Sequence, residues 1–246
     1  MAGKTLINGT AYTVKGGTTK VNGTGSKIAR GKTKIDGTAW TIAFGRLPSG
    51  YTEVEYIKNT GASYIDSQYA CPLNGFKAKC KISEDEKKSF YQWFCGVIDN
   101  GGNGAGECAF GDSWGDKKWR TGFNGAAAVA SDFFNLNQAY ELDVTIIRGE
   151  QKLYADNVLK CSAAGTGNAY AGSIFIFTEN YRGSPRSDSF WFGKCYHLQL
   201  YTPDGVLVRD FVPCINPSNQ VGMYDLVTNQ FFGNSGSGSF IAGNPV

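Results

Sequence analysis

The chain has 246 residues, of which 33 are Gly, 14% are aromatic and 18% are charged. Many Gly-rich turns, many aromatic residues and no long charged helical stretches argue against a helical or parallel α/β fold and favour an all-β protein. No apolar run approaches the length of a transmembrane helix, and the first residues lack the apolar segment of a signal peptide. We therefore expect a protein that is made in a cytosol and does not insert into membranes.

The net charge of +3 is unevenly distributed along the chain. Residues 1–46 contain eight Lys and Arg and a single acidic residue, Asp36, which gives this segment a net charge of +7. The remaining 200 residues contain 16 Lys and Arg and 20 acidic residues, a net charge of −4. A basic segment of this kind could bind nucleic acid or an acidic partner protein. Of these two partners, we expect residues 1–46 to bind an acidic protein and not nucleic acid.

Residues 3–44 contain three copies of a 14-residue repeat, which begin at Gly3, Gly17 and Gly31. Each copy has Asn-Gly or Asp-Gly between two short β-rich runs, and these dipeptides favour the type I′ turn of a β-hairpin. The repeat therefore predicts three hairpins within a first domain, residues 1–46. Because one short hairpin is not stable alone, the hairpins should stack on each other, on a partner or on symmetry-related copies. The alternative is that residues 1–46 form a loosely ordered basic arm. We also expect the protein to form a homo-oligomer.

The second domain comprises residues 47–246 and begins in a short Gly- and Pro-containing linker. Its strand-like runs are separated by Gly-rich loops, and none is followed by the helix that a parallel sheet would need. In residues 140–148, Leu142, Val144 and Ile146 alternate with polar residues, as in a strand with one buried face. Residues 84–88 would suit either a short helix or a charged turn. The pattern predicts an antiparallel β-sandwich.

Two groups of motifs lie near the ends of this domain. The first is Leu47-Pro-Ser-Gly-Tyr-Thr-Glu-Val-Glu-Tyr-Ile57, and the second is Gly205-Val-Leu-Val-Arg-Asp-Phe-Val-Pro-Cys214 followed by Gly222-Met-Tyr-Asp-Leu226. Together they resemble a family of concanavalin A-like, LamG-type domains found in phage and prophage structural proteins and in bacterial surface proteins. The resemblance covers residues 47–243 and implies a jelly-roll β-sandwich. The N-terminal repeats are similar to hairpin repeats of phage virion proteins.

The two resemblances together imply a non-enzymatic bacteriophage virion structural protein, made in the cytoplasm of the host bacterium. Residues 1–46 would attach it to other virion proteins, and the sandwich would be a lectin-like domain for adhesion to cell-surface or mucosal glycans. The alternative is a capsid decoration or tail component whose sandwich contacts only other virion proteins. Because such a family is defined by its fold, the resemblance implies an architecture and leaves the ligand open.

The residues that could support catalysis do not form a known motif, and we predict no enzymatic activity. A glycosidase needs two carboxyl groups that flank the scissile bond. Glu141-Leu-Asp143 begins the Glu-x-Asp-x-x-Glu pattern of sandwich-fold glucanases, but Ile146 stands where the second Glu is required. His197 is the only histidine, and it lies in an alternating strand with no nucleophile assigned beside it, so we interpret it as structural.

Two segments combine aromatic and polar residues in Gly- or Asp-rich surroundings, which is typical of carbohydrate-binding sites. They are Asp112-Ser-Trp-Gly-Asp116 with the nearby Trp119, and Glu179-Asn-Tyr-Arg182. The predicted carbohydrate-binding residues are Trp114, Trp119, Asp112, Asp116, Tyr181 and Arg182. The alternative is that these rings pack inside the sandwich, as Trp93 and Trp191 are expected to do.

The seven cysteines are scattered, odd in number and without a C-x-x-C pair. This spacing fits neither a zinc site nor a disulfide framework, so we expect buried free thiols in a reducing compartment. We predict no cofactor. Calcium stays open for a LamG-type domain, although the spacing of the loop residues Asp99, Asp112, Asp116 and Asp188 matches no calcium loop.

Overall fold

The computed structural model describes residues 2–7, 10–15, 18–21, 24–27, 30–35, 38–43, 46–88, 92–99, 106–112 and 116–246. The chain divides into two compact units, Met1–Tyr51 and Thr52–Val246, which are described separately below. The described residues form β-strands and no helix, so the all-β prediction is confirmed. It follows that no described segment is a helix long and apolar enough to span a membrane.

The first unit contains, in its described residues, three antiparallel hairpins. Strand β1 (Ala2–Ile7) pairs with β2 (Thr10–Lys15), β3 (Thr18–Val21) pairs with β4 (Thr24–Lys27), and β5 (Arg30–Ile35) pairs with β6 (Thr38–Ala43). The predicted hairpin repeat is therefore confirmed. The turn dipeptides at 8–9, 22–23 and 36–37, for which we predict type I′ turns, lie outside the described residues.

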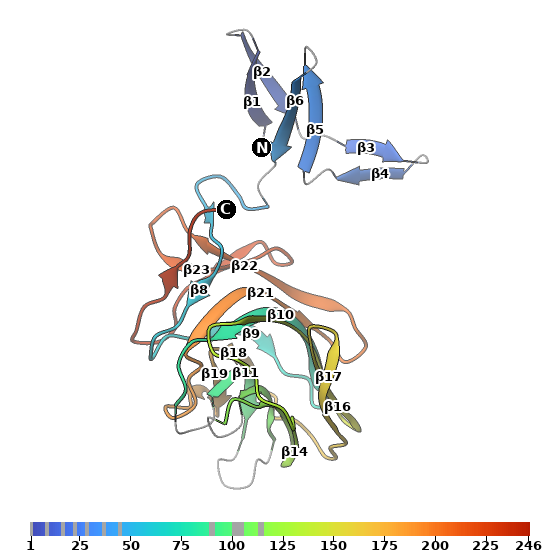
Figure 1. The fold of residues 1–246 in the computed structure, drawn as a ribbon, viewed down its shortest axis with the longest axis vertical. Helices are drawn as coiled ribbons and strands as arrows, with labels where there is room; N and C mark the ends of the chain where they lie inside the picture. Colours follow the sequence, from blue (N-terminus) through green and yellow to red (C-terminus); the bar gives the residue numbers. More distant parts are fainter. Residues whose placement is uncertain are drawn as a thin grey trace. The chain divides into compact units, whose positions relative to one another are not determined.

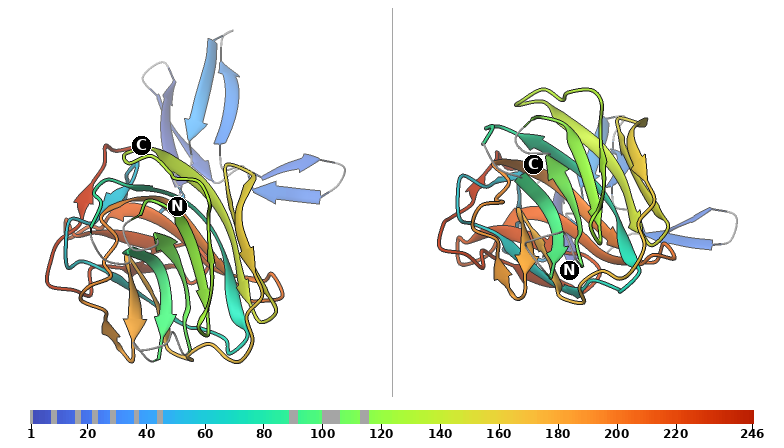
Figure 2. Two further views of the ribbon diagram at one scale, coloured as in Figure 1. Left: turned by 60° about the horizontal axis from the view of Figure 1, so that its bottom comes forward. Right: turned by 90° about the horizontal axis from the view of Figure 1, so that it is seen from below.

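The second unit consists of two stacked sheets, whose layers are visible from three sides in Figures 1 and 2. The described strands of the larger sheet follow the order β17 (Val158–Ala163), β16 (Glu150–Ala155), β15 (Ala139–Ile147), β10 (Gly75–Glu84), β21 (Gly193–Tyr201), β22 (Leu207–Ile215), β23 (Val221–Asp225) and β24 (Gln230–Phe232). Three short strands extend this sheet: β7 (Thr52–Glu53), β8 (Ile57–Lys58) and β25 (Ile241–Ala242).

The smaller sheet has the described order β14 (Ala126–Val129), β13 (Trp119–Phe123), β12 (Cys108–Asp112), β11 (Gln92–Ile98), β18 (Ser173–Ile176) and β9 (Ile65–Ala70). Strands β19 (Thr178–Tyr181) and β20 (Ser184–Pro185) form a hairpin at its β11 side. In Figure 1 the long strands β10 and β21 arch over β9, β18 and β11. This arrangement is a jelly-roll β-sandwich, as predicted.

The core lies between the two sheets and follows from the alternation of apolar side chains. On β15 the side chains of Leu142, Val144 and Ile146 are buried, whereas Glu141 and Asp143 on the opposite face are exposed. The prediction for this strand is confirmed. Segment 84–88 is not helical: β10 ends at Glu84, and the described residues after it are irregular.

Phe177 separates strands β18 and β19. Its φ of 71° lies in the left-handed region, which a bulky residue rarely adopts. Strand β18 before it runs antiparallel to β11, and β19 after it runs parallel to β11. The buried Phe177 ring and a 2.6 Å hydrogen bond from its amide to the Phe94 carbonyl oxygen hold this reversal in place.

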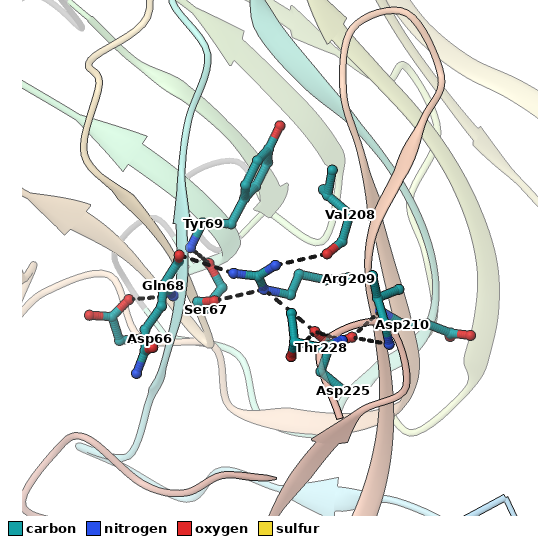
Figure 3. Close-up of polar contacts among 10 residues, drawn as sticks. Asp66, Ser67, Gln68, Tyr69, Val208, Arg209, Asp210, Asp225 and Thr228 are labelled. Carbon is teal, nitrogen blue, oxygen red and sulfur yellow. Dashed lines mark hydrogen bonds and ion pairs between the residues drawn. The ribbon is translucent and has the colours of Figure 1, made fainter. Parts of the chain in front are cut away.

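The second motif of the sequence contributes a tie between the two sheets, shown in Figure 3. Arg209 of β22 donates from Nε to the Ser67 carbonyl oxygen and from Nη2 to the Gln68 carbonyl oxygen of β9, each at 3.0 Å. Its Nη1 donates to the Val208 carbonyl oxygen at 2.8 Å, and its Nε lies 3.6 Å from Asp225 Oδ2. The arginine therefore links strands of different sheets through their backbone.

Asp225 is the buried counter-ion of this arginine and has no exposed surface. Its Oδ1 accepts hydrogen bonds from the amides of Asp210 at 2.7 Å and Val227 at 3.1 Å. Its Oδ2 accepts from the Thr228 amide at 3.2 Å and the Thr228 hydroxyl at 2.7 Å. A buried carboxylate with this many donors stabilises the fold, and so the motif that carries the family resemblance is structural here.

All seven cysteines are buried and free. Cys80, Cys95, Cys108 and Cys195 have no exposed surface, and burial raises the pKa of each of these thiols. A thiol that is held protonated in an apolar surrounding is inert as a nucleophile. The predicted use of cysteine as a small buried residue is confirmed, while the reducing compartment stays a prediction.

Candidate glycan-binding site

Two of the predicted residues, Tyr181 and Arg182, lie next to each other at the end of hairpin β19–β20. The Arg182 guanidinium carbon is 5.8 Å from the centroid of the Tyr181 ring, and Arg182 Nε donates to Asp99 Oδ1 at 2.8 Å. Tyr181 is 36% exposed, and the side chains of Arg182 and Asp99 are 57% and 46% exposed. The Tyr181 ring, the Arg182 guanidinium and the Asp99 carboxylate therefore lie close together and are all exposed.

Tyr170 belongs to the same end of the sandwich, although no motif in the sequence points to it. Its amide donates to the Gly106 carbonyl oxygen at 2.7 Å. A Cβ atom on Gly106 would lie 2.9 Å from Cβ of Asp99 and 3.2 Å from Cβ of Tyr170. With its φ of +71°, Gly106 allows the chain at Asp99 and the chain at Tyr170 to approach each other.

Arg182 has a strained backbone conformation. Tyr181 pairs with Ser184, so Arg182 and Gly183 form a two-residue hairpin turn. Their φ values of 51° and 92° are both positive, as a type I′ turn requires. Asn or Gly is the usual residue at the first of these positions, and an arginine there costs on the order of 1 kcal/mol. Strain of this kind is characteristic of binding sites, which supports a functional role for Arg182.

The buried side chain of Asn180, which is 2% exposed, stabilises the strained turn. Its Nδ2 donates to the Ser173 carbonyl oxygen at 2.7 Å, and its Oδ1 accepts from the Gly183 amide at 2.6 Å. The first bond fixes β19 to β18, and the second closes the turn. Asn180 therefore positions Tyr181 and Arg182 without being accessible to a ligand itself.

A buried group of charges connects this hairpin to the rest of the smaller sheet. Arg186 Nη1 donates to Oε1 of the fully buried Glu179 at 2.7 Å, and Arg120 Nη2 lies 3.9 Å from Oε1 of Glu107. Burial, with Glu107 nearby, raises the pKa of Glu179 to about 8. Burial also raises the pKa of Glu107 to about 7, against the opposing effect of Arg120 and Arg186. Both carboxyls are too deeply buried to meet a ligand.

The structure does not combine the five described residues of the predicted set into one site. Strand β11 separates them, because Gln92 at its start pairs with Asp112, and Ile98 at its end pairs with Tyr181. Asp112 and Trp119 are themselves register partners on β12 and β13. The Tyr181 group and the Asp112 group therefore lie at opposite ends of β11.

Trp119 occupies a core position rather than the predicted loop position. It is the first residue of β13 and is only 1% exposed. Its ring stacks on Phe134 at 4.3 Å and on Trp191 at 6.3 Å between centroids, and Tyr140 meets its edge. The ring offers no face to a sugar in this structure. The interpretation of Trp119 as a packing residue, the alternative kept open above, describes it correctly.

The remaining predicted residues differ in accessibility. Asp112 has no exposed surface, and its Oδ1 accepts a hydrogen bond from the Lys118 amide at 2.9 Å, so it organises the chain between β12 and β13. Asp116 is exposed. Trp114 lies outside the described residues, and its assignment to a carbohydrate site stays a prediction.

The carboxylates considered for catalysis lie in ion pairs on the outer face of the larger sheet. Glu141 Oε1 is 3.4 Å from Lys81 Nζ, and Asp143 Oδ2 is 3.0 Å from Lys79 Nζ. His197 Nε2 lies 3.1 Å from Glu141 Oε2, on the same exposed face. Glu141 and Asp143 each pair with a lysine of the neighbouring strand β10, and His197 of β21 reaches Glu141 across β10, as expected for charges on a solvated sheet face.

The residues considered for calcium have other partners. Asp99 binds Arg182, and Asp188 Oδ1 accepts from Arg186 Nε at 2.9 Å. Within the ranges that the structure describes, no group of three or more His, Cys, Asp and Glu residues could hold a metal ion. The two acids therefore contribute to hairpin β19–β20, where they neutralise arginines.

No family model matches the chain, and no curated protein matches it. Solved structures do match. A "putative carbohydrate binding protein" from Bacteroides ovatus is 13% identical, with 91% of this chain and 68% of that chain covered and a TM-score of 0.56. A heptameric SAP-like pentraxin from Limulus polyphemus is 15% identical, with 61% and 76% covered and a TM-score of 0.44.

A mutant of Trypanosoma rangeli sialidase that displays trans-sialidase activity also matches, with 18% identity and a TM-score of 0.37. The match covers 51% of this chain and only 20% of the sialidase. At these identities a likeness shows the fold and not the activity. The likeness to the Bacteroides ovatus protein, with a TM-score above 0.5, agrees with the jelly-roll β-sandwich described for the second unit.

Proposed function

We propose that the sandwich is a non-catalytic, lectin-like domain that binds glycans through Tyr181, Arg182 and Asp99, with Tyr170 beside them. The observation that carries the proposal is the exposed Tyr181 ring beside the Arg182–Asp99 pair on a strained turn. The ring can pack against the C–H face of a sugar. The guanidinium can donate to sugar oxygens, and the carboxylate can accept from hydroxyl groups.

The distribution of carboxyl groups supports binding over hydrolysis. Glu107 and Glu179 have the raised pKa values that a general acid needs, but they are 4% and 0% exposed. Glu141 and Asp143 are exposed but paired with lysines on the outer sheet face. A glycosidase requires two accessible carboxyls on either side of the bond. We therefore propose that the domain binds glycans without hydrolysing them.

We further propose that the protein is a structural component of a bacteriophage virion, made in the host cytoplasm, with residues 1–46 as its attachment segment and a homo-oligomeric state. The motivation is the resemblance of the end motifs and of the hairpin repeat to virion proteins, together with the confirmed hairpins. Immunogold labelling of particles with antibodies to residues 47–246 tests this. Labelled particles with the sandwich accessible are expected; unlabelled particles with the protein only in host cells would reject the virion role.

A glycan array with the full chain tests the binding site. Tyr181→Ala and Arg182→Ala should each weaken binding to the recognised glycan at least about tenfold, which corresponds to about 1.4 kcal/mol. Phe133→Ala is the matched control, because Phe133 is 64% exposed and carries Lys118 Nζ 4.9 Å from its ring centroid. The control should bind as the unmodified chain does. Unchanged binding in both site variants would show that the glycan binds elsewhere on the protein. Binding to no host or mucosal glycan would reject the adhesion proposal.

A further inference from the structure

The two charges exposed beside Tyr181 cancel each other. Arg182 Nε donates to Asp99 Oδ1 at 2.8 Å, so that one cation and one anion form a hydrogen-bonded pair. The hydrogen bond and the charge of Asp99 raise the pKa of Arg182, and the phenol groups of Tyr181 and Tyr170 act in the same direction. Residues 100–105, which follow Asp99 in the sequence, include no charged residue. The Arg182–Asp99 pair therefore presents no net charge to a ligand.

The next charges along the chain after hairpin β19–β20 cancel as well. Arg186 Nε donates to Asp188 Oδ1 at 2.9 Å, and Arg186 Nη1 donates to Oε1 of the buried Glu179 at 2.7 Å. Burial, with Glu107 nearby, raises the pKa of Glu179 to about 8, so that this carboxyl is mostly protonated at pH 7. Arg186 and Asp188 then form a second neutral pair, and this end of the sandwich does not favour an anionic ligand over a neutral one.

The Arg182–Asp99 pair retains hydrogen-bonding groups for a ligand although its charges cancel. Within the described residues the Arg182 side chain donates to Asp99 through Nε alone, and a guanidinium has further N–H groups on both Nη atoms. Asp99 accepts this bond on Oδ1, and its Oδ2 is a second acceptor. A hydroxyl group both donates and accepts. Two adjacent hydroxyl groups of one sugar can therefore accept from Arg182 and donate to Asp99 at the same time.

Two tyrosine rings border this pair. The Tyr181 ring lies beside the Arg182 guanidinium. The Tyr170 ring lies over Gly172, where a Cβ atom would be 2.4 Å from Tyr170 Cε1 and 3.2 Å from Asn180 Nδ2. The glycine thus allows the Tyr170 ring to approach strand β19. An aromatic ring packs against the C–H face of a sugar whether or not that sugar is charged. The rings therefore contribute affinity, and the Arg182–Asp99 pair distinguishes one sugar from another.

We propose that the site selects neutral sugars with two adjacent hydroxyl groups and discriminates against sugars that carry a carboxylate. This inference rests on the proposed glycan-binding function. A neutral sugar leaves the hydrogen bond between Arg182 and Asp99 intact. The carboxylate of an acidic sugar would compete with Asp99 for the same guanidinium, and like charges held close together repel. Asp99 is therefore the residue that determines this specificity.

Pairs of glycans that differ only in charge test the inference on an array with the full chain. Each pair ends either in galactose and galacturonate or in glucose and glucuronate. We expect the neutral member to bind at least about tenfold more tightly than its acidic counterpart. Its affinity should be the same at about 50 mM and about 500 mM salt, because no net charge is neutralised on binding.

Equal or tighter binding of the acidic members, or binding confined to uronate and sialylated glycans, would overturn the inference and leave the glycan-binding function in place. Binding to no glycan on the array would reject both. The comparison uses the unmodified chain, so its outcome does not depend on the stability of any variant.

Asp99→Asn tests the origin of the selectivity. The amide is close in size to the carboxylate, and its oxygen still accepts from Arg182, but it has no negative charge. We expect the acidic member of each pair to gain at least about fivefold relative to the neutral member. Asp143→Asn is the matched control, because Asp143 is also an exposed partner in an ion pair, with Lys79 at 3.0 Å. The control should keep the original ratio. An unchanged ratio in Asp99→Asn, or an equal change in both variants, would show that Asp99 does not determine the specificity.

Discussion

Replacement of Asp225 by alanine is expected to lower the free energy of unfolding of the sandwich by about 3–5 kcal/mol, since removal of one partner leaves the other charge buried. Arg209, whose side chain is 13% exposed, would lose its counter-ion. The amides of Asp210, Val227 and Thr228 would lose their acceptor at the same time. Urea denaturation followed by tryptophan fluorescence measures this loss.

Asp143→Ala is the control for this experiment. Asp143 also forms an ion pair, with Lys79 at 3.0 Å, but both side chains are more than half exposed. Solvent screens such a pair, so its loss should cost no more than about 1 kcal/mol. An Asp225→Ala variant as stable as the Asp143→Ala variant would show that the buried Arg209–Asp225 pair does not stabilise the sandwich.

Replacement of Glu84 by glutamine is expected to stabilise the protein at neutral and alkaline pH. Glu84 is 1% exposed, and neither of its carboxyl oxygens has a hydrogen-bond partner among the described residues. Burial, with the charge of Asp112 nearby, raises its pKa from 4.5 to about 9. At pH 7 the folded protein therefore keeps a proton that the unfolded chain has released, and this difference favours unfolding.

Glu84 makes the protein less stable as the pH rises. Below about pH 4.5 Glu84 is protonated in both states and adds no pH dependence to the stability. As the pH rises toward 9, the free energy of unfolding falls by on the order of 1 kcal/mol per pH unit through this group. Glu107 and Glu179 add slopes of the same sign over narrower ranges, up to about pH 7 and 8.

Urea denaturation between pH 5 and pH 9, the interval just below the folded-state pKa, compares the unmodified chain with two variants. Glu84→Gln should flatten the decline in stability. Glu86→Gln should leave it unchanged, because the Glu86 side chain is 59% exposed two positions further along the chain. A Glu84→Gln variant that is less stable than the unmodified chain at pH 8 would mean that the ionised carboxylate is stabilising.

The parts of the fold that the sequence predicted correctly are those with a local signal. The 14-residue repeat and its turn dipeptides predict the three hairpins, and the alternation around Leu142 and Val144 predicts a half-buried strand. The scattered spacing of the seven cysteines predicts that they are buried free thiols. The hairpins and the strand depend on residues close together in the chain, where side-chain periodicity and turn preferences dominate.

The candidate site could be predicted only in part, because its geometry depends on distant residues. Arg182 and Asp99 are 83 positions apart, and no local pattern pairs them. Trp119 resembles an exposed loop aromatic in its Asp-rich surroundings, yet the pairing of Asp112 with Trp119 across β12 and β13 places the ring in the core. Glu84 was expected in a helix or charged turn, but it ends a buried strand. Whether such residues are buried depends on contacts between strands that are far apart in the sequence.

The proposed function depends most directly on where a glycan contacts the sandwich, and NMR chemical-shift mapping measures this. The full chain, labelled with 15N, is titrated with the glycan that binds most tightly on the array. We predict that the largest shifts fall on Asp99, Tyr170, Tyr181 and Arg182, at one end of β11. The largest shifts at Asp112 and Asp116, at the other end of β11, or on the outer face of the larger sheet around His197, would contradict the proposed site.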